Sequence, residues 1–308
     1  MTDWIALSDR RDPRFASPGA QIERGIFVME FSLPLAGSAV LLNQQTGGGV
    51  PRTLSVFLEP QVGLMILHRQ GAVLRRHVLP GPLPLTQGVG RLSFSFDTTV
   101  GHWRMQLDVT GGEDAVWATG RDPLPLALDD LQRLCANQSA LQRHPAVLWF
   151  GATLQPALPD RAPWIGLNTL VDTLTGPVPA GNLRPGMHIL TLDDGPLPLL
   201  RVTHRDLPSA GFFAPVLLRA PFYGAMRDLL VSADQQVMLS GTLVEYHFGE
   251  DEVLIPAGAL IDGHKALAEH RRAVTSSVAL DLGCPSLFTA DGCVLMSDGA
   301  DQIGRAHV

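Results

Sequence analysis

The sequence predicts an all-β protein of two domains. Short apolar runs recur about every ten residues, separated by Gly, Pro, Asp and Thr, and this rhythm is typical of strands and turns rather than of alternating strands and helices. The chain has 308 residues, whereas single cores rarely grow past roughly 250. A proline-rich segment near the middle supplies a break between two halves, so we expect two separate β domains.

The first half carries eight candidate strands. In residues 92–96, three apolar side chains alternate with two serines, so one face of that strand is apolar. Residues 128–136 place three leucines at helical spacing, and we expect one short helix there. The expected strands lie at residues 25–33, 39–44, 53–59, 63–70, 73–79, 90–97, 102–109 and 146–153.

The strand rhythm of residues 20–153 resembles a laminin-G-like or concanavalin-type jelly-roll sandwich. The resemblance rests on residues 90–97, on the Trp-bearing strand that follows, and on a late Trp-Phe-Gly strand. Related folds include sugar-binding lectins and glucanases, and a glucanase requires closely spaced carboxylates on one strand. Glu113 and Asp114 are adjacent and would point to opposite faces, so we interpret them as part of a solvated turn.

The break between the halves is rich in proline. Residues 155–163 read Gln-Pro-Ala-Leu-Pro-Asp-Arg-Ala-Pro, which excludes helix and interrupts sheet pairing. We therefore divide the chain into a β-sandwich at residues 1–153, a linker at 154–163 and a second β domain at 164–300. The two domains are expected to fold separately.

The second half is also mostly β. Only residues 258–272 look partly helical. The expected strands lie at residues 169–173, 187–192, 199–205, 215–220, 229–232, 237–241, 242–248, 253–257 and 286–290. Within residues 227–239, the period-two rule turns Leu229, Val231, Val237 and Leu239 to the core and Leu230 to the opposite face.

Four segments of this half stand in a recognisable order: residues 169–202, 227–241, 252–263 and 287–292. Together they resemble the Hedgehog/intein (Hint) domains common in marine α-proteobacteria, and the likeness extends over residues 164–292. The first of these segments carries two turn signals that need no function. Leu183-Arg-Pro-Gly-Met contains a turn, and Asp193-Asp-Gly is expected to join a strand at 189–192 to one at 199–202.

The resemblance implies a self-cleaving site, and this chain departs from the family pattern at each part of it. The nucleophilic Cys or Ser position is occupied by Trp164, and no Cys, Ser or Thr lies between Thr153 and Thr169. The family's His-Arg pair matches Gln235-Gln236, and Gln235 is expected near the vestigial site. Its late histidines match Ser277 and, near the second, Gly283 or Cys284. We therefore expect no catalytic residues and no autoprocessing.

Composition argues against several other functions. The net charge of −7 is scattered, which disfavours nucleic acid as a partner. No membrane span or signal peptide is visible, so the expected compartment is the cytoplasm by default, or the exterior by a leaderless route. Four histidines, His204, His247, His264 and His270, lack metal-site spacing, and we expect neither metal nor cofactor.

The three cysteines allow two interpretations. Cys284 and Cys293 could form a bridge, but buried free thiols are the favoured interpretation for Cys135, Cys284 and Cys293. Cys284 could alternatively be a reactive thiol, with His264 or His270 brought near it by folding.

Two functions remain open. In the first, the protein is a non-catalytic binding or interaction module whose N-terminal domain contacts a glycan or a protein. In the second, it retains intein-like or Hedgehog-like self-cleavage or splicing. The first is preferred because Trp164 cannot replace the missing nucleophile.

Overall fold

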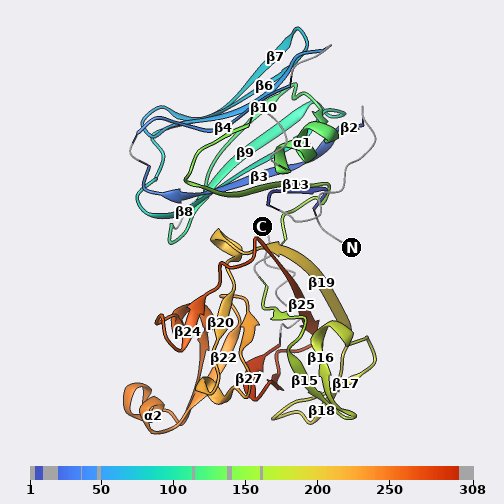
Figure 1. Ribbon diagram of the computed structural model, residues 1–308, viewed down its shortest axis with the longest axis vertical. Coiled ribbons are helices and arrows are strands. Elements are labelled where there is room, and N and C mark those ends of the chain that lie inside the picture. Colours follow the sequence, from blue (N-terminus) through green and yellow to red (C-terminus); the bar gives the residue numbers. More distant parts are fainter. Residues whose placement is uncertain are drawn as a thin grey trace. The chain divides into compact units, whose positions relative to one another are not determined.

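The computed structural model describes residues 4–9, 20–35, 37–46, 50–112, 115–136, 141–159 and 162–297. The chain divides into two compact units, residues 3–159 and residues 160–308 (Figure 1). Strands dominate both units, which confirms the prediction of an all-β protein. Two α-helices lie in the described residues, α1 (Leu128–Cys135) and α2 (Thr242–Phe248), and neither is long and apolar enough to span a membrane.

The first unit is a sandwich of two antiparallel sheets. The six-stranded sheet has, in spatial order, β1 (Ala6–Leu7), β13 (Val147–Thr153), β3 (Arg24–Leu33), β8 (Gly88–Asp97), β9 (His102–Val109) and β10 (Val116–Arg121). The five-stranded sheet has β12 (Leu141–Arg143), β4 (Ala39–Thr46), β5 (Arg52–Glu59), β6 (Gly63–Gln70) and β7 (Val73–Pro80). A short ribbon joins β2 (Gln21–Ile22) to β11 (Leu126–Ala127).

Strand alternation builds the core of the sandwich. Leu92, Phe94 and Phe96 are buried while the intervening serines are half-exposed, as the pattern in residues 92–96 predicts. One cluster joins these side chains to those of the opposing sheet. All eight strands expected in this half are present, and α1 follows the expected helix to within one residue.

Strand β10 was missed: Val, Trp and Thr in its sequence, Val-Trp-Ala-Thr-Gly-Arg, favour a strand, whereas Ala and Gly do not. Gly120 is nonetheless required there, since a Cβ at this position would lie 2.4 Å from the ring of Trp103 on the neighbouring strand. The packing of Trp103 therefore requires a glycine at position 120, and that glycine makes the strand harder to recognise in the sequence.

The second unit contains two further sheets. The first has, in spatial order, β19 (Arg201–Pro208), β25 (Val274–Asp281), β14 (Ile165–Gly166), β21 (Leu229–Val231), β20 (Val216–Leu218) and β24 (Ala266–Ala268). The second has β18 (Pro196–Pro198), β17 (His188–Leu190), β15 (Leu170–Thr173), β26 (Leu287–Ala290), β27 (Cys293–Met296), β22 (Gln236–Ser240) and β23 (Glu252–Pro256), with β16 (Gly176–Pro179) on β15.

Single-turn 3₁₀ helices connect the strands of this unit. They lie at Ala180–Asn182, Gly211–Phe213, Phe222–Gly224 and Ala257–Leu260.

Two expectations for the second unit are wrong, and a third, that residues 258–272 are partly helical, holds for one turn only. The run at 242–248 is helix α2, because Gly241 and the left-handed Gly249 bound it and the hairpin of β22 with β23 requires the chain to reverse there. The segment expected to be partly helical forms one 3₁₀ turn and then strand β24. The turn at 193–195 joins β17 to β18, whereas β19 begins later and pairs with β25 in the other sheet.

The expected burial pattern of residues 227–239 is confirmed. Leu229, Val231 and Val237 are buried, Leu239 is partly buried against the same cluster, and Leu230 is half-exposed on the opposite face. This region forms the two short strands β21 and β22, separated by a turn that carries Gln235.

Candidate functional site

The start of the second unit lies in the middle of a sheet. Strand β14 pairs with β21 on one side and with β25 on the other, so that Ile165 lies between Val231 and Val278. The preceding residue, Trp164, is buried. Its amide N–H donates to the Ser232 hydroxyl at 3.3 Å, and its carbonyl accepts from the Ser232 N–H at 3.0 Å. The Pro163–Trp164 peptide bond is therefore held in place by Ser232.

Trp164 and Gln235 line one small hollow. Its walls are Pro163, Trp164, Ile165, Gln235, Val278, Leu280, Phe288, Met296 and Ser297. Folding therefore brings together the first residue of the unit, the turn after β21, the late strand β25 and the end of β27. Trp164 and Gln235, two of the positions at which the sequence leads us to expect a departure from the Hint pattern, both line this hollow.

Gln235 has a structural role in the hollow. Its amide nitrogen donates to the Met296 carbonyl at 2.7 Å and to the Gln236 carbonyl at 3.1 Å. A carboxamide has two N–H donors. Both are used on main-chain carbonyls of β22 and β27, so no donor of this amide is available to the Pro163–Trp164 peptide.

The late segment does not complete a site. Ser277 is buried on β25, and its hydroxyl donates to the Arg205 carbonyl at 3.2 Å on the neighbouring strand. Cys284 is exposed at the turn after β25, with its Sγ 3.4 Å from the Ser286 hydroxyl. Ser297, which lines the hollow, donates its hydroxyl to the Cys284 carbonyl at 3.2 Å.

Ser232 is the residue that the sequence analysis missed. It lies three residues before Gln235, the position that matches the family's histidine in the sequence analysis. Its place close to Gln235 in the sequence could have drawn attention to it, and its hydroxyl accepts the amide N–H of residue 164.

Asp291 ties three segments of the unit together. One carboxylate oxygen accepts from the Arg227 guanidinium at 2.6 and 2.9 Å, and the other accepts the Leu170 N–H at 3.0 Å. The main chain on either side closes the same junction, where the Asp291 carbonyl accepts the Met226 N–H at 2.7 Å. These contacts join three of the four motif segments to one another. They give the segments a structural role that requires no catalysis.

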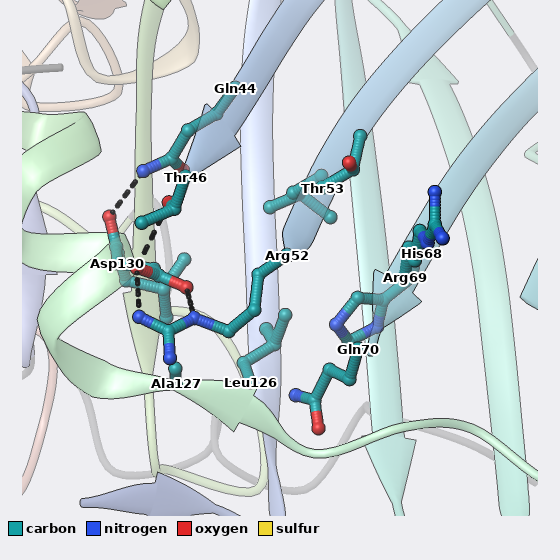
Figure 2. A pocket seen from close by; sticks show the side chains of 12 residues that line it. Gln44, Thr46, Arg52, Thr53, His68, Arg69, Gln70, Leu126, Ala127 and Asp130 are labelled. Carbon is teal, nitrogen blue, oxygen red and sulfur yellow. Dashed lines mark hydrogen bonds and ion pairs between the residues drawn. The ribbon is translucent and has the colours of Figure 1, made fainter. Parts of the chain in front are cut away.

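The sandwich has a polar hollow between the five-stranded sheet and α1 (Figure 2). Asp130 on α1 accepts from Thr46 at 3.2 Å and from the Arg52 guanidinium at 2.9 Å, and its carbonyl accepts from Gln44 at 3.0 Å. Gln70 donates to the Pro125 carbonyl. Since these groups bond mainly to one another, the cluster anchors the helix to the sheet.

The cysteines are free, as preferred from the sequence. Cys135 and Cys293 are buried, and burial raises the pKa of the Cys293 thiol to about 12. Cys284 is exposed, so the expectation of three buried thiols is wrong for that residue.

The histidines lie apart from Cys284. His264 packs against Phe222, and His270 lies against the Ser209 carbonyl. Neither of these contacts involves Cys284. Within the described parts of the chain, no group of three His, Cys, Asp or Glu side chains could hold a metal ion. Glu113 and Asp114 lie outside the described residues.

The second unit is thus mostly β, with its first strand in mid-sheet beside the turn that carries Gln235 and the end of β27. Residues 166–295 match the family model described as "Hint domain". This part of the chain is a Hint domain.

No curated protein matches the chain, and the solved structures that it resembles include an intein and a laminin fragment. The gp41-1 intein is 16% identical, with a TM-score of 0.30, over 44% of this chain and 98% of the intein. The LG1-3 region of the laminin alpha2 chain is 8% identical, with a TM-score of 0.32, over 96% of this chain. The match spans 56% of that laminin chain.

Proposed function

We propose that the Hint domain of this protein neither cleaves nor splices, and that the protein acts as a binding or interaction module. The observation that carries the proposal is the position of Trp164. Its side chain stands where a self-cleaving domain needs a thiol or hydroxyl, and it lines the hollow beside a glutamine whose two donors are already used.

The missing chemistry can be stated as one step. Self-cleavage begins when the side-chain heteroatom of residue 164 attacks the Pro163 carbonyl carbon, forming an ester or thioester as the C–N bond breaks. The departing nitrogen must take up a proton, which a histidine supplies in the family pattern. An indole has no comparable nucleophilic atom, and the Gln235 amide does not titrate near neutral pH. The chain therefore lacks both the nucleophile and the proton donor that this step requires.

One observation favours residual self-cleavage as a second candidate. The Ser232 hydroxyl lies 3.3 Å from the Trp164 nitrogen, beside the peptide bond that would break. That hydroxyl accepts the amide N–H, and among the described residues that line the hollow none carries an imidazole to take its proton. Ser232 therefore supports the peptide geometry better than it supports attack, which makes this candidate the weaker one.

The sandwich supplies the binding part of the proposal. Its ligand, a glycan or a protein, is the expectation carried over from its strand pattern. A glycan-array screen of the full-length protein tests the glycan half of that expectation.

Intact mass tests the loss of self-cleavage. The wild type, Trp164→Cys and Trp164→Cys/Gln235→His are incubated with dithiothreitol at neutral pH, with Ser232→Ala as the matched hydroxyl control. We expect the wild type and Trp164→Cys to remain intact at 33.1 kDa. Release of residues 1–163 from the double variant alone would identify the two missing groups.

Thiol-dependent release of that fragment from the wild type would overturn the proposal. If this release disappeared in Ser232→Ala, the second candidate would be correct.

A further inference from the structure

Four apolar side chains form a straight row on the outer face of the five-stranded sheet. Val40, Phe57, Met65 and Val78 are direct cross-strand neighbours on β4, β5, β6 and β7. Val40 and Val78 are 41% and 43% exposed, and Phe57 and Met65 are half-buried. We call these four residues the apolar row. Contiguous exposed apolar surface of this kind commonly marks a binding site.

The apolar row is the floor of a hollow of about 380 Å³. Small-molecule sites in proteins have volumes of roughly 300–1,000 Å³ and are mainly apolar, with a few polar groups that orient the ligand. The polar side chains at this hollow are Ser38 and Glu59, and the Ser38 hydroxyl donates to the Glu59 carboxylate. Of the described residues that line the hollow, Glu59 is the one ionisable group.

The row is narrow and of defined length. Three interstrand spacings separate Val40 from Val78, which is about 14 Å. On one side the next cross-strand neighbours of the same face are Asn43, Ser55, Leu67 and Arg76, three of them polar, and Ser55 donates to Asn43 at 2.6 Å. Glu59 lies two residues beyond Phe57 on the same face of β5, about 7 Å farther along the strand.

These dimensions select among ligands. A glycan needs several hydrogen-bonding groups, and the two available here already bond to each other. A standard protein interface buries about 800 Å² on each partner, which is more area than the four side chains of the apolar row provide. A hydrocarbon chain fits such a strip, and the carboxylate at its edge complements a cation and repels an anion.

We propose that this face binds an amphiphilic amine, with its hydrocarbon chain along the apolar row and its protonated nitrogen at Glu59. The proposal rests on the proposed binding role of the sandwich and names the class and place of its ligand. It does not depend on the state of the Hint site.

Calorimetric titration of the full-length protein with decylammonium and with decanoate, both below their critical micelle concentrations, tests the ligand class. We expect decylammonium to bind about tenfold more tightly than decanoate. Hexylammonium, which covers only part of the row, should bind much more weakly than decylammonium. Glu59→Gln should abolish the preference for the cation.

Val78→Thr tests the place, and Leu74→Thr is its matched control. Leu74 is also 43% exposed on the outer face of β7, but it does not line the hollow. Val78→Thr should weaken decylammonium binding roughly fivefold, and Leu74→Thr should leave it unchanged. Both sites are on the surface, and unchanged circular dichroism and melting temperature would show that the variants remain folded.

Equal affinity for decanoate, equal effects of Val78→Thr and Leu74→Thr, or no binding of decylammonium would each overturn the inference. Binding on a glycan array without binding of decylammonium would overturn it while leaving the proposed function intact. Self-cleavage of the wild type would refute the proposed loss of activity without affecting this site.

Discussion

Replacing His77 should reduce the sensitivity of the sandwich to acid. His77 is 1% exposed, and within the described residues neither ring nitrogen has a hydrogen-bond partner. Its ring packs against Phe94 and Trp103, with centroids 4.8 and 4.9 Å apart. Burial, assisted by the Arg75 guanidinium, lowers the pKa of His77 to about 4. Burial, followed by repulsion from His77, lowers the pKa of His68 to about 4.

The direction in which stability changes with pH follows from proton uptake. The unfolded chain binds a proton at each of these histidines below about pH 6.5, whereas the folded chain binds it only near pH 4. The free energy of unfolding is therefore unaffected above pH 6.5 and falls as the pH is lowered from 6.5 to 4. At pH 5 the loss is about 1–2 kcal/mol for each histidine, a large share of a typical total stability.

His77→Leu should remove the part of this loss in unfolding free energy that comes from His77. Leucine is close to histidine in volume and has no polar atom to bury. The measurement is urea unfolding at pH 7.5 and at pH 5, followed by tryptophan fluorescence, because four of the five tryptophans lie in the sandwich. We expect the difference between the two midpoints to shrink by about 0.5–1 M urea. Any change in packing cancels, since it contributes equally at both pH values.

The control for this prediction is His102→Gln, at an exposed histidine on β9, which should leave the pH dependence unchanged. A His77→Leu protein with the pH dependence of the wild type would refute the reasoning. It would show that the imidazole of His77 is protonated in the folded state as readily as in the unfolded chain.

Three further predictions concern the framework. Arg227→Met should destabilise the Hint domain by about 1–3 kcal/mol in thermal melts, because it leaves the 5%-exposed Asp291 carboxylate without its cation. Adding Asp291→Asn to this variant should recover much of the lost stability, because the asparagine carries no charge. Gly292→Ala should lower the free energy of unfolding by more than about 2 kcal/mol, because its Cβ would lie 2.5 Å from the Gly224 carbonyl oxygen. Gly186 has a similar positive φ but open space around it, so Gly186→Ala should lower the free energy of unfolding by only about 1 kcal/mol in the same thermal melts. Limited proteolysis should cut first within residues 155–163 and release two folded fragments, and cutting mainly inside residues 30–150 would show that the boundary is wrong.

Local patterns predicted most strands and the loss of the catalytic groups. Alternation at residues 92–96 identified a strand with one buried face, because side chains of a strand point to opposite faces in turn. The order of the motif segments predicted the Hint domain, and the identities of Trp164 and Gln235 predicted that its chemistry is missing. These inferences depend on residue type and spacing, which the sequence contains in full.

Helix α2 shows where local patterns fail. Thr242–Phe248 carries residues typical of strands, yet it forms a helix in the connection between β22 and β23. The deciding factor is the pairing of two strands on either side of it, which leaves this run without a strand partner. Propensity is a weak preference that tertiary context overrides.

The sequence by itself determined that the chain is all-β and that its second half is a Hint domain, and it led to the expectation that Trp164 stands where a nucleophile is needed. The tertiary structure decided that both Gln235 donors bond to strand carbonyls, that Ser232 holds the Pro163–Trp164 bond, and that four apolar residues align across β4 to β7. The physical reason is the register between strands. A shift of one residue would turn the four apolar side chains to the other face, and register is set by contacts between residues far apart in the chain.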